Sequence, residues 1–92
     1  MKIVINKCWG GFSLSKKAYE YLGLEWDDFG FKYNDEEKRT DPKLIECVET
    51  LGDEANGRYA NLKVVEIPDG TPYEIEYYDG VETVIAPKTI YG

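Results

Sequence analysis

Two short segments of the chain carry residue types that are able to bind an anionic ligand. The first segment supplies Lys7, Trp9, Gly10 and Gly11, which offer an ammonium group, an indole ring and backbone amides left open by two glycines. Such a set is able to hold a phosphate beside a base or a ribose. Its spacing matches no phosphate-binding loop, so a plain turn anchored by aromatic residues is the alternative.

The second set flanks a predicted helix over residues 42–51. Arg39 and Thr40 precede this helix, and Asn56, Arg58 and Tyr59 follow it. Arginine suits planar, bidentate contact with phosphate or carboxylate, and a helix N-terminus favours anions. A helix of this length spans about 15 Å, so the two arginines meet at one small ligand only if a homo-oligomer joins them across an interface. In the alternative, each arginine pairs with nearby acidic residues.

Catalytic and metal chemistry find little support. The chain has no histidine, which removes His-dependent acid–base chemistry, the usual nucleophile pairs and most transition-metal sites. Glu74 and Glu76 share one predicted strand face, where paired carboxylates act in some enzymes but where solvated glutamates are common. The acidic runs lack the alternating oxygens and the glycine of a calcium loop. We expect no enzyme activity and no cofactor or metal.

The charge distribution argues against direct binding to nucleic acid. The chain of 92 residues has 18 acidic and 11 basic side chains, a net charge of −7, whereas phosphate neutralisation requires a basic face. Residues 25–41 hold seven acids and three bases, which is −4 of that −7. An acidic mimic of nucleic acid is the less favoured alternative to a compact acidic loop.

Length and composition predict one small domain over residues 1–92. The apolar fraction of 42% is sufficient for an ordered core, and eight tyrosines suggest aromatic surface at an interface. We find no secretion signal and no apolar run long enough for a membrane span, and the two cysteines suit free thiols in a reducing compartment. These features predict a cytoplasmic protein without membrane contact.

Two helices are marked by their caps. Ser15 and Gly23 predict a helix over residues 16–22, and Asp41, Pro42 and Gly52 predict the helix over residues 42–51. The segment between them, residues 24–40, predicts an ordered flap whose aromatic side chains cover the core. The alternation of apolar and polar residues over 29–33 also suits a short edge strand.

Strands are predicted over residues 1–6, 62–67, 73–78 and 81–86. The unbroken apolar run of the first strand predicts burial on both faces. Asp79-Gly80 predicts a tight hairpin with Tyr78 opposite Val81 and Ile75 opposite Val84. We expect an α+β fold with a small, mainly antiparallel sheet of about four strands and two helices packed on one face. The last three strands should form a meander, and residues 89–91 form a tail able to dock on the domain or on a partner.

Three segments resemble a family of small uncharacterised proteins of bacteriophages and bacterial genomes. The matching residues are KIVINKCWGGFSLS at 2–15, RTDPKLIECVETLGDEANGRYANLKVVEIPDG at 39–70 and YEIEYYDG at 73–80. The resemblance implies no activity and no catalytic residue. It does imply a phage protein in the bacterial host cytoplasm, a setting in which small proteins commonly act by binding.

These observations lead to two expectations of function. The first is a non-enzymatic binding protein that counters a host defence by sequestering a nucleotide-derived signal in a pocket formed by an oligomer. The second is a protein–protein inhibitor that binds a host protein through the acidic, aromatic surface from Trp26 to Tyr33. An enzyme acting on small substrates is the third and least supported class.

Overall fold

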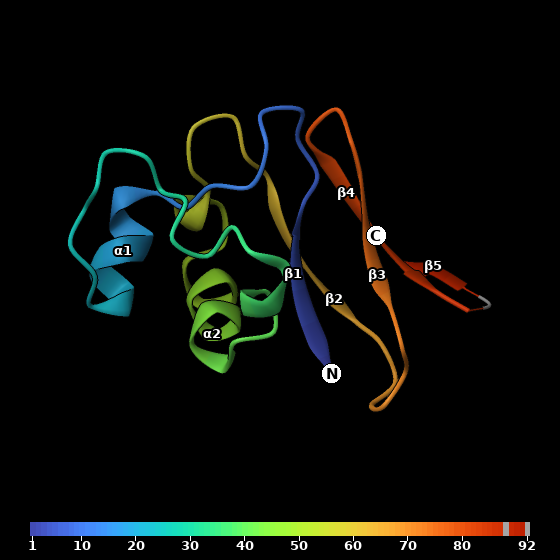
Figure 1. Ribbon diagram of the computed structural model, residues 1–92. Helices are drawn as coiled ribbons and strands as arrows, with labels where there is room; N and C mark the ends of the chain where they lie inside the picture. The colour runs from blue at the N-terminus through green and yellow to red at the C-terminus, as the bar shows by residue number, and fades with distance from the viewer. Residues whose placement is uncertain (88, 92) are drawn as a thin grey trace.

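The computed structural model describes residues 1–87 and 89–91, which form an α+β fold with two helices and five strands (Figure 1). The elements in chain order are β1 (Lys2–Asn6), α1 (Lys16–Leu22), the 3₁₀ turn η1 (Glu36–Lys38), α2 (Pro42–Leu51), the 3₁₀ turn η2 (Gly52–Ala55), β2 (Leu62–Glu66), β3 (Glu74–Tyr78), β4 (Val81–Ala86) and β5 (Thr89–Tyr91). The predicted fold class is confirmed.

Both helices begin and end at the predicted residues. The Ser15 side chain accepts the backbone N–H of Ala18, and the Asp41 side chain accepts that of Lys43. Gly23 and Gly52 follow the two helices with positive φ angles. Local capping chemistry therefore decides both boundaries.

The strands form two antiparallel sheets, so the predicted single sheet of about four strands is wrong. β1 pairs with β2, placing Val4 opposite Val64, and β3, β4 and β5 form the second sheet in that order. The predicted meander fails because β2 and β3 are not paired. The chain turns at Pro68, whose carbonyl accepts the N–H of Thr71, and the β3–β4 hairpin then packs over β1 instead of extending its sheet.

This stacking gives β1 two buried faces, as the apolar run predicted. On one face Val4 belongs to a core cluster with Leu44 and Val48 of α2. On the other face Ile3 and Ile5 pack in a second cluster with Val84 of β4. Figure 1 shows β1 and β2 between the helices and the second sheet, and the main contacts of α1 are with α2 and η2. Burial on both sides explains why no polar residue interrupts the centre of β1.

The C-terminal hairpin has the predicted register. Tyr78 lies opposite Val81 and Ile75 opposite Val84. Asp79 and Gly80 both have positive φ angles, 48° and 84°, as a two-residue type I′ turn requires. The tail docks on the domain, because β5 pairs with β4 and places Ile90 opposite Ile85.

The flap over residues 24–40 contains one 3₁₀ turn and no strand, so the suggested edge strand at 29–33 is wrong. Trp26 and Tyr33 pack against the core as expected. Phe29 and Phe31 do not, since they are 68% and 53% exposed and stack on each other with ring centroids 6.4 Å apart. The flap therefore covers the core with two of its aromatic side chains and presents two to solvent.

Candidate functional site

The structure brings the first predicted segment against the end of the second. Trp9 stacks on Tyr59 with ring centroids 5.0 Å apart and an interplanar angle of 27°. Gly10 permits this contact, because a Cβ atom at that position would lie 2.2 Å from the Cβ of Tyr59. The two rings remain 68% and 57% exposed, so they form an aromatic ledge on the surface. We call Trp9 and Tyr59 the aromatic ledge.

The residues that follow α2 also line a pocket of about 320 Å³, and Arg58 is one of its lining residues. Lys16 adds a second cation, while Trp26 and Phe29 add aromatic rings. Its lining residues are Leu14, Ser15, Lys16, Trp26, Asp28, Phe29, Asn56, Gly57 and Arg58. We call this the cationic pocket, because two basic side chains stand against the single carboxylate of Asp28.

Hydrogen bonds between two distant segments build one wall of the cationic pocket. Leu14 and Asn56 form an isolated antiparallel bridge, and the N–H of Gly57 donates to the carbonyl of Ser13 at 3.0 Å. The Ser15 hydroxyl, besides capping α1, donates to the carbonyl of Glu54 at 2.6 Å. Residues 13–15 are therefore fixed against residues 54–57, which sets the separation of Lys16 and Arg58.

The opposite wall is held by Asp27. Its Oδ1 accepts the backbone N–H groups of Phe29 and Gly30, both at 2.9 Å, and its Oδ2 accepts the hydroxyl of Tyr19 at 3.1 Å. The backbone N–H groups of Gly30 and then Phe29 hold the pKa of the Asp27 carboxyl below its ordinary value. Trp26 packs edge-on against the buried Tyr19 ring, so this aromatic side of the pocket rests on the core.

The cations of the pocket are free of acidic partners in the described ranges. Neither Lys16 nor Arg58 forms an ion pair there, whereas the neighbouring Lys17 is bound to Glu54 at 2.9 Å. The guanidinium of Arg58 lies 5.7 Å from the Tyr59 ring centroid, which connects the pocket to the aromatic ledge. The expectation that Arg58 pairs with nearby acids is not met.

Arg39 has a structural place instead of a place in this site. It is 2% exposed, and its guanidinium stacks 3.8 Å from the Phe12 ring centroid. Two N–H groups bind the Glu82 carboxylate at 2.5 and 2.8 Å, and the others donate to the carbonyls of Val4, Tyr33 and Asn34. All five guanidinium donors are occupied, so Arg39 has none to offer a ligand.

The remaining predicted residues lie in different parts of the fold. Thr40 is half-buried next to Arg39 at the start of α2, away from the Asn56 end of that helix. The ammonium of Lys7 donates to the carbonyl of Glu82 at 3.0 Å, so it serves the fold. Gly11 is half-buried with a φ of 87° and ends the loop that carries Trp9. The structure therefore unites Trp9, Gly10, Asn56, Arg58 and Tyr59 in one region. Gly11 shares the loop of Trp9, whereas Lys7 and Arg39 serve the fold and Thr40 lies at the other end of α2.

Sequence reasoning missed two buried polar residues. Asn6 is fully buried, and its amide donates to the carbonyls of Cys8 and Gly80 and accepts the N–H groups of Cys8 and Asn61. Glu82 is 5% exposed. The sequence does indicate the burial of Glu82, because Glu82 alternates along the strand with the same parity as the inward-facing Val84 and Ala86. A carboxylate on a core face requires a partner.

The buried thiol of Cys47 is not an activated nucleophile. Cys47 is buried against the carbonyl of Ala18, and desolvation raises the pKa of its thiol to about 11. The described part of the chain holds no group of three or more side chains suited to a metal ion. The arrangement of the cationic pocket suits binding of an anion that carries a ring, through charge and stacking.

Comparisons of the sequence with protein-family models and with curated proteins, and of the chain with solved structures, find no match. The resemblance to small phage and bacterial proteins therefore stays a prediction. None of the helices within residues 1–87 and 89–91 has the length and apolar content of a membrane span.

Proposed function

We propose that this protein is a non-enzymatic binding protein that holds a nucleotide-like small molecule in the cationic pocket. The observation that supports it is the lining itself: Lys16 and Arg58 supply positive charge, and Trp26 and Phe29 supply rings. A phosphate would pair with the two cations while a base stacks on an aromatic face. The volume of about 320 Å³ lies at the lower end of the range for small-molecule sites.

The resemblance to phage proteins gives this binding a context. We infer that the ligand is a nucleotide-derived signal of the host, which the protein withdraws from a defence system. The buried position of Arg39 removes it from the interface that the sequence suggested, so an oligomer would act by joining the pockets or aromatic ledges of two chains. Native mass spectrometry of the purified protein reports both the assembly and any retained ligand.

A binding experiment with variants tests the pocket. The protein is titrated calorimetrically with ADP-ribose and with cyclic dinucleotides. Arg58→Gln should weaken binding by about tenfold or more, because a charge-assisted contact is lost. Lys63→Gln is the matched control, since Lys63 is an exposed lysine on β2. Unchanged affinity in Arg58→Gln, or no heat and no thermal shift with any of these nucleotides, refutes the proposal.

One observation favours a second candidate, a protein–protein inhibitor acting through the flap. Phe29 and Phe31 are exposed and stacked among acidic residues, an arrangement typical of protein-binding surfaces. Crosslinking in a bacterial lysate should then enrich one host protein, and Phe31→Ser should abolish its recovery. Phe31 is not among the residues that line the cationic pocket, so this variant separates the two candidates.

A further inference from the structure

The outer edge of β3 is open in the described part of the chain. β3 pairs with β4 alone and lies at the edge of its sheet. A two-residue type I′ turn closes on a hydrogen-bonded pair, here Tyr78 and Val81, so alternate residues of β3 bond to β4. The backbone groups of Ile75 and Tyr77 therefore point outward, and none of them has a partner among the described residues.

The outer edge of β1, in contrast, is covered by groups from other parts of the fold. The N–H of Val4 donates to the carbonyl of Arg39 at 2.9 Å, and its carbonyl accepts from the Arg39 guanidinium. The N–H of Asn6 donates to Glu82 at 2.8 Å. No comparable group covers β3 within residues 1–87 and 89–91. Natural proteins generally protect open strand edges, so an uncovered edge is a candidate for pairing with another chain.

The side chains of β3 indicate the charge of the segment that would pair with it. Glu74 and Glu76 lie on one face of the strand and are exposed, and neither forms an ion pair in the described ranges. Tyr77 and Tyr78 are 65% and 76% exposed. A second copy of a chain with a net charge of −7 would bring like charges together. A basic segment would instead place a cation beside each glutamate.

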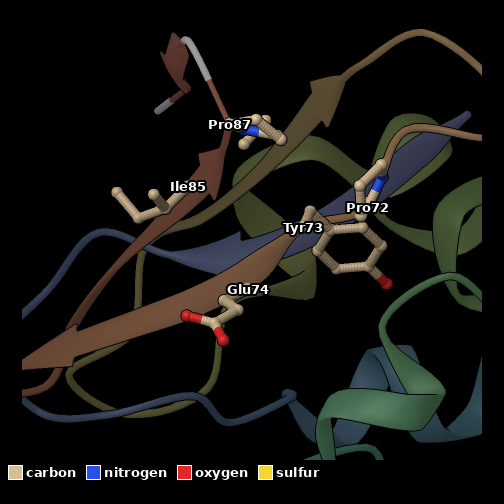
Figure 2. Close-up of a pocket in the computed structure, with 6 residues that line it drawn as sticks. Pro72, Tyr73, Glu74, Ile85 and Pro87 are labelled. Atoms are coloured by element: carbon tan, nitrogen blue, oxygen red, sulfur yellow. The ribbon is translucent and has the colours of Figure 1, made fainter.

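A pocket at the beginning of β3 supplies a place for one long side chain. It has a volume of about 410 Å³ and is lined by Pro72, Tyr73, Glu74, Ile85, Ala86 and Pro87. Figure 2 shows Tyr73 and Glu74 leaving the start of β3 in different directions, with Ile85 and Pro87 contributed by the neighbouring chain segment. Apolar walls with one carboxylate suit a lysine or arginine, whose stem is apolar and whose end is charged.

We propose that β3 is a docking edge for an extended segment of a partner protein in which lysine or arginine alternates with apolar residues. The segment adds as a further strand beside β3, using the outward backbone groups of Ile75 and Tyr77. Its basic side chains lie near Glu74 and Glu76, and one of them enters the pocket at the start of the strand. This surface is separate from the cationic pocket and does not depend on the proposed function.

A peptide in which lysine alternates with valine is the probe, with binding measured by fluorescence anisotropy. Tyr77→Pro removes an N–H that does not bond to β4 and should weaken binding by about tenfold or more. Tyr77→Ala is the matched control, because it removes the same ring and keeps the N–H, so its affinity should stay closer to that of the unchanged protein. Glu74→Lys combined with Glu76→Lys should abolish binding of this peptide and permit binding of one with glutamate in place of lysine.

A second arm does not depend on the folding of any variant. The unchanged protein is titrated with two versions of the same peptide, in which N-methyl groups occupy one or the other set of alternate amides. The version in which the methyl groups replace the N–H donors that pair with β3 should not bind. Equal binding of the two methylated versions overturns the proposal, as does unaltered binding by a folded Tyr77→Pro variant. Sedimentation that shows a dimer lost in Tyr77→Pro also overturns it, since a second copy then occupies the edge.

Discussion

Removal of the buried carboxylate of Glu82 should destabilise the protein severely. In the native structure this carboxylate binds the Arg39 guanidinium at 2.5 and 2.8 Å and accepts the N–H of Asn6 at 2.8 Å. The two side chains of the ion pair are 2% and 6% exposed. Glu82→Ala therefore leaves a buried guanidinium without its counter-ion and three N–H groups without acceptors.

The expected loss is about 3–5 kcal/mol of the free energy of unfolding, which is typical when one partner of a buried ion pair is removed. Domains of this size have about 5–15 kcal/mol in total, so the variant should be marginal or unfolded at 37 °C. In thermal unfolding the Tm should fall by about 12–40 °C, from about 4–8 °C per kcal/mol. Glu82→Gln keeps the shape and one acceptor and should lose less.

Urea unfolding monitored by tryptophan fluorescence measures the effect, and the exposed ion pair between Lys2 and Glu49 supplies the control. These two side chains are 41% and 45% exposed, so Glu49→Ala should cost only about 0–1 kcal/mol. A double-mutant cycle with Arg39→Met isolates the pair, and the double variant should cost less than the sum of the two single changes. If Glu82→Ala costs no more than Glu49→Ala, the reasoning from burial is refuted.

Three further outcomes are expected. In urea unfolding, Gly80→Ala should destabilise the protein more than Gly70→Ala. Both positions have positive φ, but of the two only Gly80 would place a Cβ atom 2.0 Å from a backbone oxygen, that of Trp9. Equal losses of stability in the two variants would contradict this expectation. Cys47, with its thiol pKa raised to about 11, should react with Ellman's reagent at pH 8 far more slowly than half-buried Cys8. Mass spectrometry of partly labelled protein identifies which thiol reacts first. Labelling of Cys47 before Cys8 would contradict this expectation. The lowered pKa of Asp27 contributes stability that is present above the ordinary value of 3.8 and is lost as the pH falls through the pKa of the folded state. Asp27→Asn should therefore be less stable than the unchanged protein in urea at pH 7, and this difference in stability should shrink at pH 3. A difference that does not depend on pH would contradict the expectation.

Local signals were sufficient for the elements that local chemistry determines. The Asp41-Pro42 start of α2 and the Asp79-Gly80 turn each act within a few residues, so the helix boundary and the hairpin register followed from the sequence. The pairing of distant strands did not. Whether the β3–β4 hairpin extends the β1–β2 sheet or covers it depends on which apolar face of β1 lacks a neighbour. An unbroken run such as Ile3 to Ile5 indicates two buried faces without saying what buries each.

The candidate site was predicted in part for the same reason. The glycine next to Trp9 and the residues after α2 were marked by type, and the structure places them in one region of the surface. Arg39 was assigned to a ligand because arginine suits anions and a helix N-terminus follows it, whereas its true partner, Glu82, is 43 residues away in the sequence. Phe29 and Phe31 were expected to cover the core, because hydrophobicity alone does not distinguish a covering aromatic residue from an exposed one.

The amide of Asn6 has a consequence for synthesis of the protein on the ribosome. It joins the loop after β1, the residue before β2 and the turn of the β3–β4 hairpin, and of these three segments the hairpin turn is synthesised last. A nascent chain that has not yet released Gly80 and Glu82 lacks an acceptor for Asn6 and the counter-ion of Arg39. β1 and the flap therefore reach their final positions only after residues 80 and 82 have emerged from the ribosome, and nascent chains truncated before residue 80 should remain protease-sensitive although both helices are complete.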